Sequence, residues 1–173
     1  MNIVLLGYMA SGKSLIGKEL AKKLNYDFID LDDYIVANER SEIAAIFKEK
    51  GEIYFRKVET RYLKEIISEK DKVVLALGGG TPCYANNMDV LNEAENCKTL
   101  YLKTSMSTLV KRLDKETDKR PLISHLSSED QLSEFIGKHL FERSYFYNQA
   151  DLSINTDNKK STEIIEDIIF ELF

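Results

Sequence analysis

A glycine-rich segment near the amino terminus carries the clearest chemical signal in the sequence. Gly7, Gly12, Lys13 and Ser14 match the spacing G-x-x-x-x-G-K-[ST]. In such a loop the backbone N–H groups surround phosphate oxygens, the lysine reaches the β and γ phosphates, and the hydroxyl can ligate Mg²⁺. The alternative is a chance glycine turn. We predict a nucleoside triphosphate site, whose residues are Ala10, Ser11, Gly12, Lys13, Ser14 and Leu15.

The loop alone does not define a reaction, because many unrelated activities use a bound triphosphate. The sequence has no NKxD string of the kind that recognises guanine. The buried run VVLAL at 73–77 is followed by three glycines, where many NTPases place an aspartate that orders magnesium. A GTPase or a large motor ATPase is therefore disfavoured.

Three carboxylates follow a short apolar segment at Phe28 and Ile29. They are Asp30, Asp32 and Asp33. Carboxylates this close repel one another, so the run is better explained beside a cation or a polyhydroxyl ligand. We interpret Asp32 as a functional residue, although an aspartate between a strand and a helix can equally be a helix N-cap. Asp33 is expected to be a cap or a solvated charge.

Two arginines stand in predicted helical segments, Arg56 within FRKVE and Arg143 directly after Glu142. The planar guanidinium pairs bidentately with a carboxylate, so two arginines suit an anionic substrate. Glu59 follows Arg56 by one helical turn and could hold that guanidinium in position. The alternative is that Arg56 is an ordinary arginine on a solvated helix face.

The elements that must position these residues alternate along the chain. Unbroken apolar runs at 3–6 and 73–77 indicate strands buried on both faces, and further strands are expected near 28–29, 99–102 and 152–154. Helices are predicted at 16–24, from Ser41 to Gly51, and at 53–67, 86–94, 108–113, 130–147 and 161–172. This order predicts an α/β fold with a mostly parallel sheet of about five strands, which binds ligands beyond the carboxyl ends of the strands.

Size and composition suggest one domain over residues 1–173. The formal net charge of −5 disfavours nonspecific attraction to nucleic acid or to an anionic membrane, and no apolar stretch approaches the length that a bilayer requires. Cys83 and Cys97 form no metal-like set and suggest free thiols of a reducing compartment. We expect a cytoplasmic protein with small-molecule partners. The polar stretch at 114–130 is expected to be a mobile lid.

Taken in order, six segments resemble shikimate kinase. They are GYMASGKSLIG, FIDLDDYI, GEIYFRKVE, LALGGGTP, RPLI and FERSYFY, and together they span nearly the whole chain. The resemblance implies the three-layer α/β/α P-loop NTPase fold of nucleoside monophosphate kinases, with a substrate-binding region at 33–62 and a lid at 114–130. It also implies ATP as co-substrate, Mg²⁺, shikimate as the acceptor, and a monomer.

Residue roles follow from the same resemblance. Asp32 holds hydroxyls of shikimate near the attacking oxygen, Arg56 and Arg143 grip the carboxylate, and Gly79 donates its N–H to the substrate. The neighbouring Gly78 and Gly80 are assigned to the same subsite. Ser14 and Asp30 are assigned to magnesium, and Lys13, Asp32 and Arg120 to catalysis, with Arg120 also closing over the phosphates. As an alternative, the glycines form a plain turn and Arg120 is a solvated residue.

Several positions depart from the family pattern. Ala10 and Ser11 stand where the family often has glycine and alanine, and Leu15 replaces the usual threonine. An arginine expected after the last strand is replaced by the region 157–159, although Arg112 resembles another that stacks on adenine.

The predicted reaction is transfer of the γ-phosphoryl group of ATP to the 3-hydroxyl of shikimate, a step of chorismate and aromatic amino-acid biosynthesis. The rivals are a related small kinase for gluconate or a nucleoside monophosphate, and a noncatalytic nucleotide-binding module.

Overall fold

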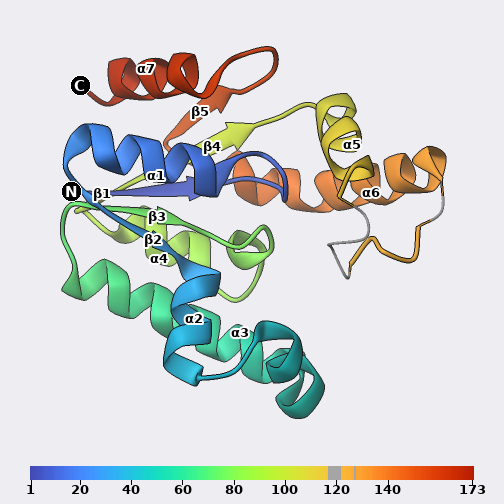
Figure 1. The fold of residues 1–173 in the computed structure, drawn as a ribbon. Helices are drawn as coiled ribbons and strands as arrows, with labels where there is room; N and C mark the ends of the chain where they lie inside the picture. Colours follow the sequence, from blue (N-terminus) through green and yellow to red (C-terminus); the bar gives the residue numbers. More distant parts are fainter. Residues whose placement is uncertain (117–121, 127) are drawn as a thin grey trace.

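The computed structural model describes residues 1–116, 122–126 and 128–173, and its centre is a sheet of five parallel strands (Figure 1). The spatial order is β2-β3-β1-β4-β5. The strands are β1 (Asn2–Leu6), β2 (Asp27–Asp30), β3 (Val73–Ala76), β4 (Cys97–Lys103) and β5 (Leu152–Asn155). The chain thus reverses its direction of winding at β1, and this places the loop after β1 at the switch point where such sheets bind ligands.

Helices cover both faces of the sheet (Figure 1). Successive side chains of a strand point to opposite faces, so Ile3 and Leu5 pack on one side and Val4 and Leu6 on the other. The first face carries α1 (Lys13–Leu24) and α7 (Ser161–Leu172). The second carries α2 (Leu31–Glu39), α3 (Ile43–Glu69) and α4 (Asn87–Glu93). This accounts for the unbroken apolar run in β1, and the three-layer α/β/α prediction is confirmed.

A third cluster of buried side chains lies beside the loop after β1. There α5 (Met106–Asp114) and α6 (Glu129–Tyr147) pack against each other and enclose Tyr8 and Tyr101. A short 3-10 helix, η1 (Thr81–Cys83), follows the glycine turn after β3. These elements surround the carboxyl ends of the central strands, where the candidate residues were expected.

The structure corrects the sequence interpretation of the interval after β2. Residues 31–39 form helix α2, which was not predicted, and its N-cap is Asp30, whose side chain accepts from the N–H of Asp32. The expectation that Ser41 caps the next helix is wrong, because Glu42 is the N-cap of α3 and makes no side-chain cap bond. Gly51 interrupts α3 with φ 82° and ψ 171°, so the predicted stop there is confirmed as a kink between two helical segments.

No helix in the described part of the chain is long and apolar enough to cross a membrane. The assignment of 33–62 to substrate binding and of 114–130 to a lid remains a prediction, and part of the latter stretch lies outside the described residues.

Candidate active site

A cavity of about 1010 Å³ opens at the carboxyl ends of β1, β2 and β3. Its walls combine the phosphate-type loop with Asp30, Asp32, Gly78 and Gly79. The walls also include Thr108, Arg112 and Asn158. The predicted nucleotide residues 10–15 therefore share one cavity with part of the predicted acceptor set.

The loop between β1 and α1 has the backbone conformation that its glycines permit. Gly7 has φ +147°, and a Cβ there would lie 2.8 Å from Ser11 Oγ and 3.0 Å from the Leu102 carbonyl oxygen. Gly12, with φ +100°, caps the start of α1. The Lys13 ammonium donates to the carbonyl oxygens of Gly7 (2.8 Å) and Tyr8 (2.9 Å). Lys13 is thus folded back onto the loop, within the same cavity wall.

Ser14 and Asp30, both assigned to magnesium, are brought into direct contact. The Ser14 hydroxyl donates to Asp30 Oδ2 at 2.8 Å, while Asp30 Oδ1 accepts from the N–H of Asp32 at 3.1 Å. Mg²⁺ in nucleotide sites is commonly held by one or two protein oxygens together with phosphate oxygens and water. A hydroxyl and a carboxylate oxygen 2.8 Å apart at the cavity wall fit that donor set.

Asp32 lies in the first turn of α2, so its alternative interpretation as the helix N-cap is wrong. Burial, reinforced by the negative charges of Asp30 and Glu59, raises the pKa of Asp32 to about 6, against the opposing effect of Lys13. Asp33 is exposed, as expected for a solvated charge. The Asp32 carboxyl therefore changes its protonation state near neutral pH.

Each glycine of the turn after β3 lies against a different predicted substrate residue. A Cβ added to Gly78 would lie 3.1 Å from Asp32 Oδ1, and one added to Gly80 would lie 3.2 Å from Arg56 Nη2. The corresponding position at Gly79 is 3.6 Å from Arg143 Nη1. The turn therefore brings together side chains from α2, α3 and α6 that are far apart in the sequence.

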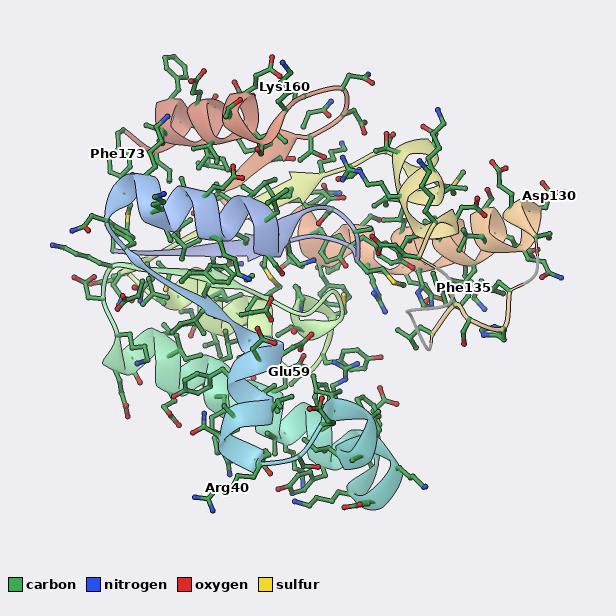
Figure 2. All side chains as sticks on the ribbon, in the orientation of Figure 1. Arg40, Glu59, Asp130, Phe135, Lys160 and Phe173 are labelled. Carbon is green, nitrogen blue, oxygen red and sulfur yellow. The ribbon has the colours of Figure 1, made fainter. Side chains whose placement is uncertain are left out.

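Arg56 is held by a network rather than being solvated, so the surface-arginine alternative is wrong. Its Nη1 donates to Glu59 Oε2 at 2.9 Å, and its guanidinium lies 3.7 Å from the centroid of the Tyr84 ring. Glu59 is only 1% exposed and lies in the interior of the molecule (Figure 2). The other Glu59 oxygen accepts from the Thr81 hydroxyl at 2.5 Å. The predicted support of Arg56 by Glu59 is confirmed, and Thr81 completes it.

Arg143 lies among aromatic side chains. Its guanidinium is 5.5 Å from the centroid of the Tyr8 ring, and the Tyr8 hydroxyl lies 3.1 Å from His139 Nδ1. Burial and the nearby Arg143 charge lower the pKa of His139. His139 therefore contacts the phosphate-type loop through Tyr8.

The comparisons with known proteins agree with this geometry. A family model described as Shikimate kinase matches residues 9–172. This chain belongs to the shikimate kinase family. It is 46% identical over 171 residues to the shikimate kinase of Flavobacterium psychrophilum, covering 99% of this chain and 98% of that protein. The shikimate kinase of Flavobacterium johnsoniae is 44% identical over 167 residues, with 96% of each chain covered.

Solved structures of shikimate kinases superpose over nearly the whole chain. The enzyme from Bacteroides thetaiotaomicron has a TM-score of 0.89 at 34% identity, covering 99% of this chain and 98% of that one. Shikimate kinase from Acinetobacter baumannii in complex with shikimate has a TM-score of 0.84 at 31% identity, covering 99% and 92%. The fold is therefore that of the family, whose co-substrate is ATP.

The departures from the family pattern have visible structural consequences. Ala10 has φ 62°, in the left-handed region that favours glycine, and this conformation costs about 1 kcal/mol for an alanine. Arg112 donates to the Ala10 carbonyl oxygen at 2.8 Å and so supports the strained residue. Asn158, in the region that replaces the expected arginine, also has a positive φ of 57°. Arg120 lies outside the described residues.

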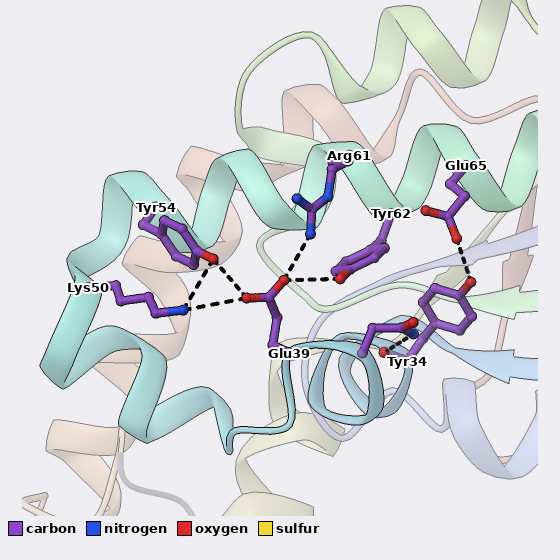
Figure 3. Close-up of polar contacts among 8 residues, drawn as sticks. Tyr34, Glu39, Lys50, Tyr54, Arg61, Tyr62 and Glu65 are labelled. Atoms are coloured by element: carbon purple, nitrogen blue, oxygen red, sulfur yellow. Dashed lines mark hydrogen bonds and ion pairs between the residues drawn. The ribbon is translucent and has the colours of Figure 1, made fainter.

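A charged residue that the sequence analysis did not single out ties α2 to α3 (Figure 3). Glu39, at the end of α2, accepts from the Tyr54 hydroxyl (2.8 Å), the Tyr62 hydroxyl (3.0 Å) and the Arg61 guanidinium (2.8 Å). Lys50 Nζ lies 3.7 Å from Glu39 Oε2, and the Gly51 kink separates Lys50 from the other three partners in α3. We call this group the Glu39 clasp. It joins the helix that begins near Asp32 to the helix that carries Arg56.

Proposed function

We propose that this chain transfers the γ-phosphoryl group of ATP to the 3-hydroxyl of shikimate, giving shikimate 3-phosphate and ADP in the route to chorismate and the aromatic amino acids. One observation carries the proposal. A phosphate-type loop and Asp32 share a cavity, and the adjoining glycine turn touches Asp32, Arg56 and Arg143. Membership of the family and the relative solved in complex with shikimate support the same substrate.

At the donor end, the loop provides backbone N–H groups and Lys13 for the phosphate oxygens. In the structure the Lys13 ammonium donates to the carbonyl oxygens of Gly7 and Tyr8, and phosphate oxygens would compete with these carbonyls for it. Ser14 and Asp30 would hold Mg²⁺, which neutralises charge on the phosphates. The loop positions 10–12 and 15 would line the triphosphate.

At the acceptor end, some residues would bind the carboxylate of the substrate and others would orient its hydroxyls. Arg56 and Arg143 would bind the carboxylate of shikimate, and the N–H of Gly79, flanked by Gly78 and Gly80, would contact the substrate. Asp32 would orient the 3-hydroxyl. Because the pKa of Asp32 is about 6, most of this carboxyl is ionised at pH 7 and can take the proton that the hydroxyl loses.

The chemical step forms a bond between the hydroxyl oxygen and the γ phosphorus and breaks the bond from that phosphorus to the bridging oxygen of ADP. Positioning and electrostatic stabilisation supply most of the rate enhancement in this class of reaction. Arg120 would add positive charge at the moving group, and closure of the 114–130 lid would exclude water. A monomeric state and a cytoplasmic location also stay predictions.

An acceptor panel tests the proposal. The purified chain is assayed for ADP release with MgATP and either shikimate, gluconate or nucleoside monophosphates, and the phosphorylated product is identified by mass spectrometry. Of these acceptors, we expect only shikimate to give turnover. Turnover with gluconate or a nucleoside monophosphate in its place would overturn the substrate assignment, and ATP binding without any turnover would indicate a noncatalytic nucleotide-binding module.

A further inference from the structure

Tyr147, the last residue of α6, reaches the glycine turn from inside the core. Its side chain is fully buried, with 0% exposure, and its ring lies 5.1 Å from that of Tyr101. Its hydroxyl donates to the Gly79 carbonyl oxygen at 2.5 Å across 68 positions of the sequence. Burial raises the pKa of Tyr147, so the hydroxyl keeps its proton and remains a donor. The residue does not line the cavity, so any effect on substrate must pass through its neighbours.

The bond from Tyr147 fixes the orientation of a peptide group. A trans peptide is planar, and its N–H points away from its C=O. The Gly78 carbonyl accepts from the N–H of Thr81 at 3.1 Å, and the Gly79 carbonyl accepts from Tyr147. With both carbonyl oxygens engaged, the N–H groups of Gly79 and Gly80 are directed to the opposite sides of their peptides. Neither N–H donates to any residue in the described part of the chain.

Arg143 is the charged neighbour of Tyr147 on the same helix. The two residues are one helical turn apart on α6, at i and i+4, where side chains meet. The positive charge of Arg143 acts on the Tyr147 hydroxyl and opposes the effect of burial on its pKa, and a Cβ on Gly79 would lie 3.6 Å from Arg143 Nη1. A tyrosine hydroxyl can accept one bond while it donates another. Tyr147 and Arg143 therefore both lie against the glycine turn at Gly79, and the acceptor position of the Tyr147 hydroxyl is suited to the guanidinium.

We propose that Tyr147 is a positioning residue for the acceptor substrate, which holds the Gly79–Gly80 peptide and Arg143 in a fixed mutual arrangement. Arg143 then meets the carboxylate of the substrate while the freed N–H groups meet its other oxygens. This inference rests on the proposed function and adds to it a residue outside the cavity wall.

The test is Tyr147→Phe, which removes the hydroxyl and keeps the ring. We expect the KM for shikimate to rise about tenfold, the scale of one buried hydrogen bond, while kcat changes by less than about threefold and the KM for ATP stays the same. Tyr101→Phe is the matched control, because it removes a hydroxyl from the neighbouring ring, and we expect unchanged constants. Thermal melting of both variants checks that they are folded.

Three outcomes would overturn the inference while the proposed function stands. These are an unchanged shikimate KM in Tyr147→Phe, an equal rise in the KM values for both substrates, and an equal rise in the Tyr101→Phe control. Absence of shikimate turnover by the unaltered chain would instead remove the proposed function, and it is seen before any variant is compared.

A double-variant cycle tests the link to Arg143 and serves if Tyr147→Phe is poorly folded on its own. In an Arg143→Ala background, which already lacks the guanidinium, we expect the additional effect of Tyr147→Phe on the shikimate KM to shrink from about tenfold to about threefold or less. A full tenfold effect in both backgrounds would show that the hydroxyl acts without the arginine, and the proposed mutual arrangement would be wrong.

Discussion

Replacing Asp32 by asparagine should stabilise the ligand-free fold while removing activity. The folded state raises the pKa of Asp32 from an ordinary value of 3.8 to about 6, mainly through burial and then through the charges of Asp30 and Glu59. One pKa unit corresponds to about 1.4 kcal/mol, so keeping Asp32 ionised in the folded state costs about 3 kcal/mol. Asparagine has nearly the same shape and carries no charge.

The pH dependence of this gain has a definite sign. Below pH 3.8 Asp32 is protonated in both the folded and unfolded states, so asparagine gains almost nothing. As the pH rises, the unfolded state loses the proton first, and the cost to the unaltered protein grows until the folded pKa of about 6 is passed. The stabilisation by Asp32→Asn should therefore be under about 1 kcal/mol at pH 4 and about 3 kcal/mol at pH 8. The value at pH 8 corresponds to a rise of about 6–12 °C in melting temperature for a chain of this size.

Urea and thermal unfolding without nucleotide, in the presence of EDTA, measure the effect. Asp33→Asn is the matched control, since Asp33 is the exposed neighbour in the same helical turn, and its stability should change by no more than about 0.5 kcal/mol at either pH. In parallel, kcat with shikimate should fall at least about a hundredfold in Asp32→Asn. An Asp32→Asn protein that is no more stable than the unaltered chain at pH 8 would refute the assigned burial and its cost.

Other substitutions probe different parts of the site. Arg143→Ala should raise the KM for shikimate at least about tenfold more than the KM for ATP, because the arginine is assigned to the carboxylate; an equal loss for both substrates, measured by steady-state kinetics, would contradict that assignment. Glu39→Ala should lower the free energy of unfolding by about 1–2 kcal/mol, because the hydroxyls of Tyr54 and Tyr62 lose their acceptor. Glu39→Gln keeps an acceptor oxygen and should lose less stability. If urea unfolding finds both variants as stable as the unaltered chain, the Glu39 clasp has no role in stability. Ala10→Gly should raise the melting temperature by a few degrees by relieving the left-handed backbone, and a lower one would show that Ala10 is not strained.

The sequence was sufficient for the sheet and the loop because their signals are local. An apolar run such as the one in β1 must be buried on both faces, and the glycine spacing at Gly7 and Gly12 requires a strand before it and a helix after it. The prediction failed at α2, where the acidic run was interpreted as the end of a strand. One of those carboxylates, Asp30, caps the helix and contacts Ser14 at the same time, so a local capping signal was indistinguishable from a ligand signal.

The residues that were missed act through partners that are distant in the sequence. Tyr147 contacts Gly79 across 68 positions of the sequence. In the sequence alone it cannot be distinguished from an ordinary aromatic residue of the core. Glu39 has the character of a surface charge, yet its side chain is 9% exposed and its partners lie on both sides of the Gly51 kink. Such contacts depend on how helices pack against one another, and no spacing rule within a single element reveals them.

The groups left unsatisfied at the acceptor end indicate what the ligand must bring. Arg56 Nε is buried without a hydrogen bond to any described residue, and its ion pair with Glu52 Oε1 is long at 3.5 Å, so a ligand oxygen at hydrogen-bond distance would improve its environment. Asp32 keeps a charge in a half-buried position at the cavity wall, where a hydroxyl donor would stabilise it. Both groups adjoin one glycine turn, so a ligand that satisfies both carries an anionic group such as a carboxylate together with a hydroxyl. A hydroxy acid meets that requirement.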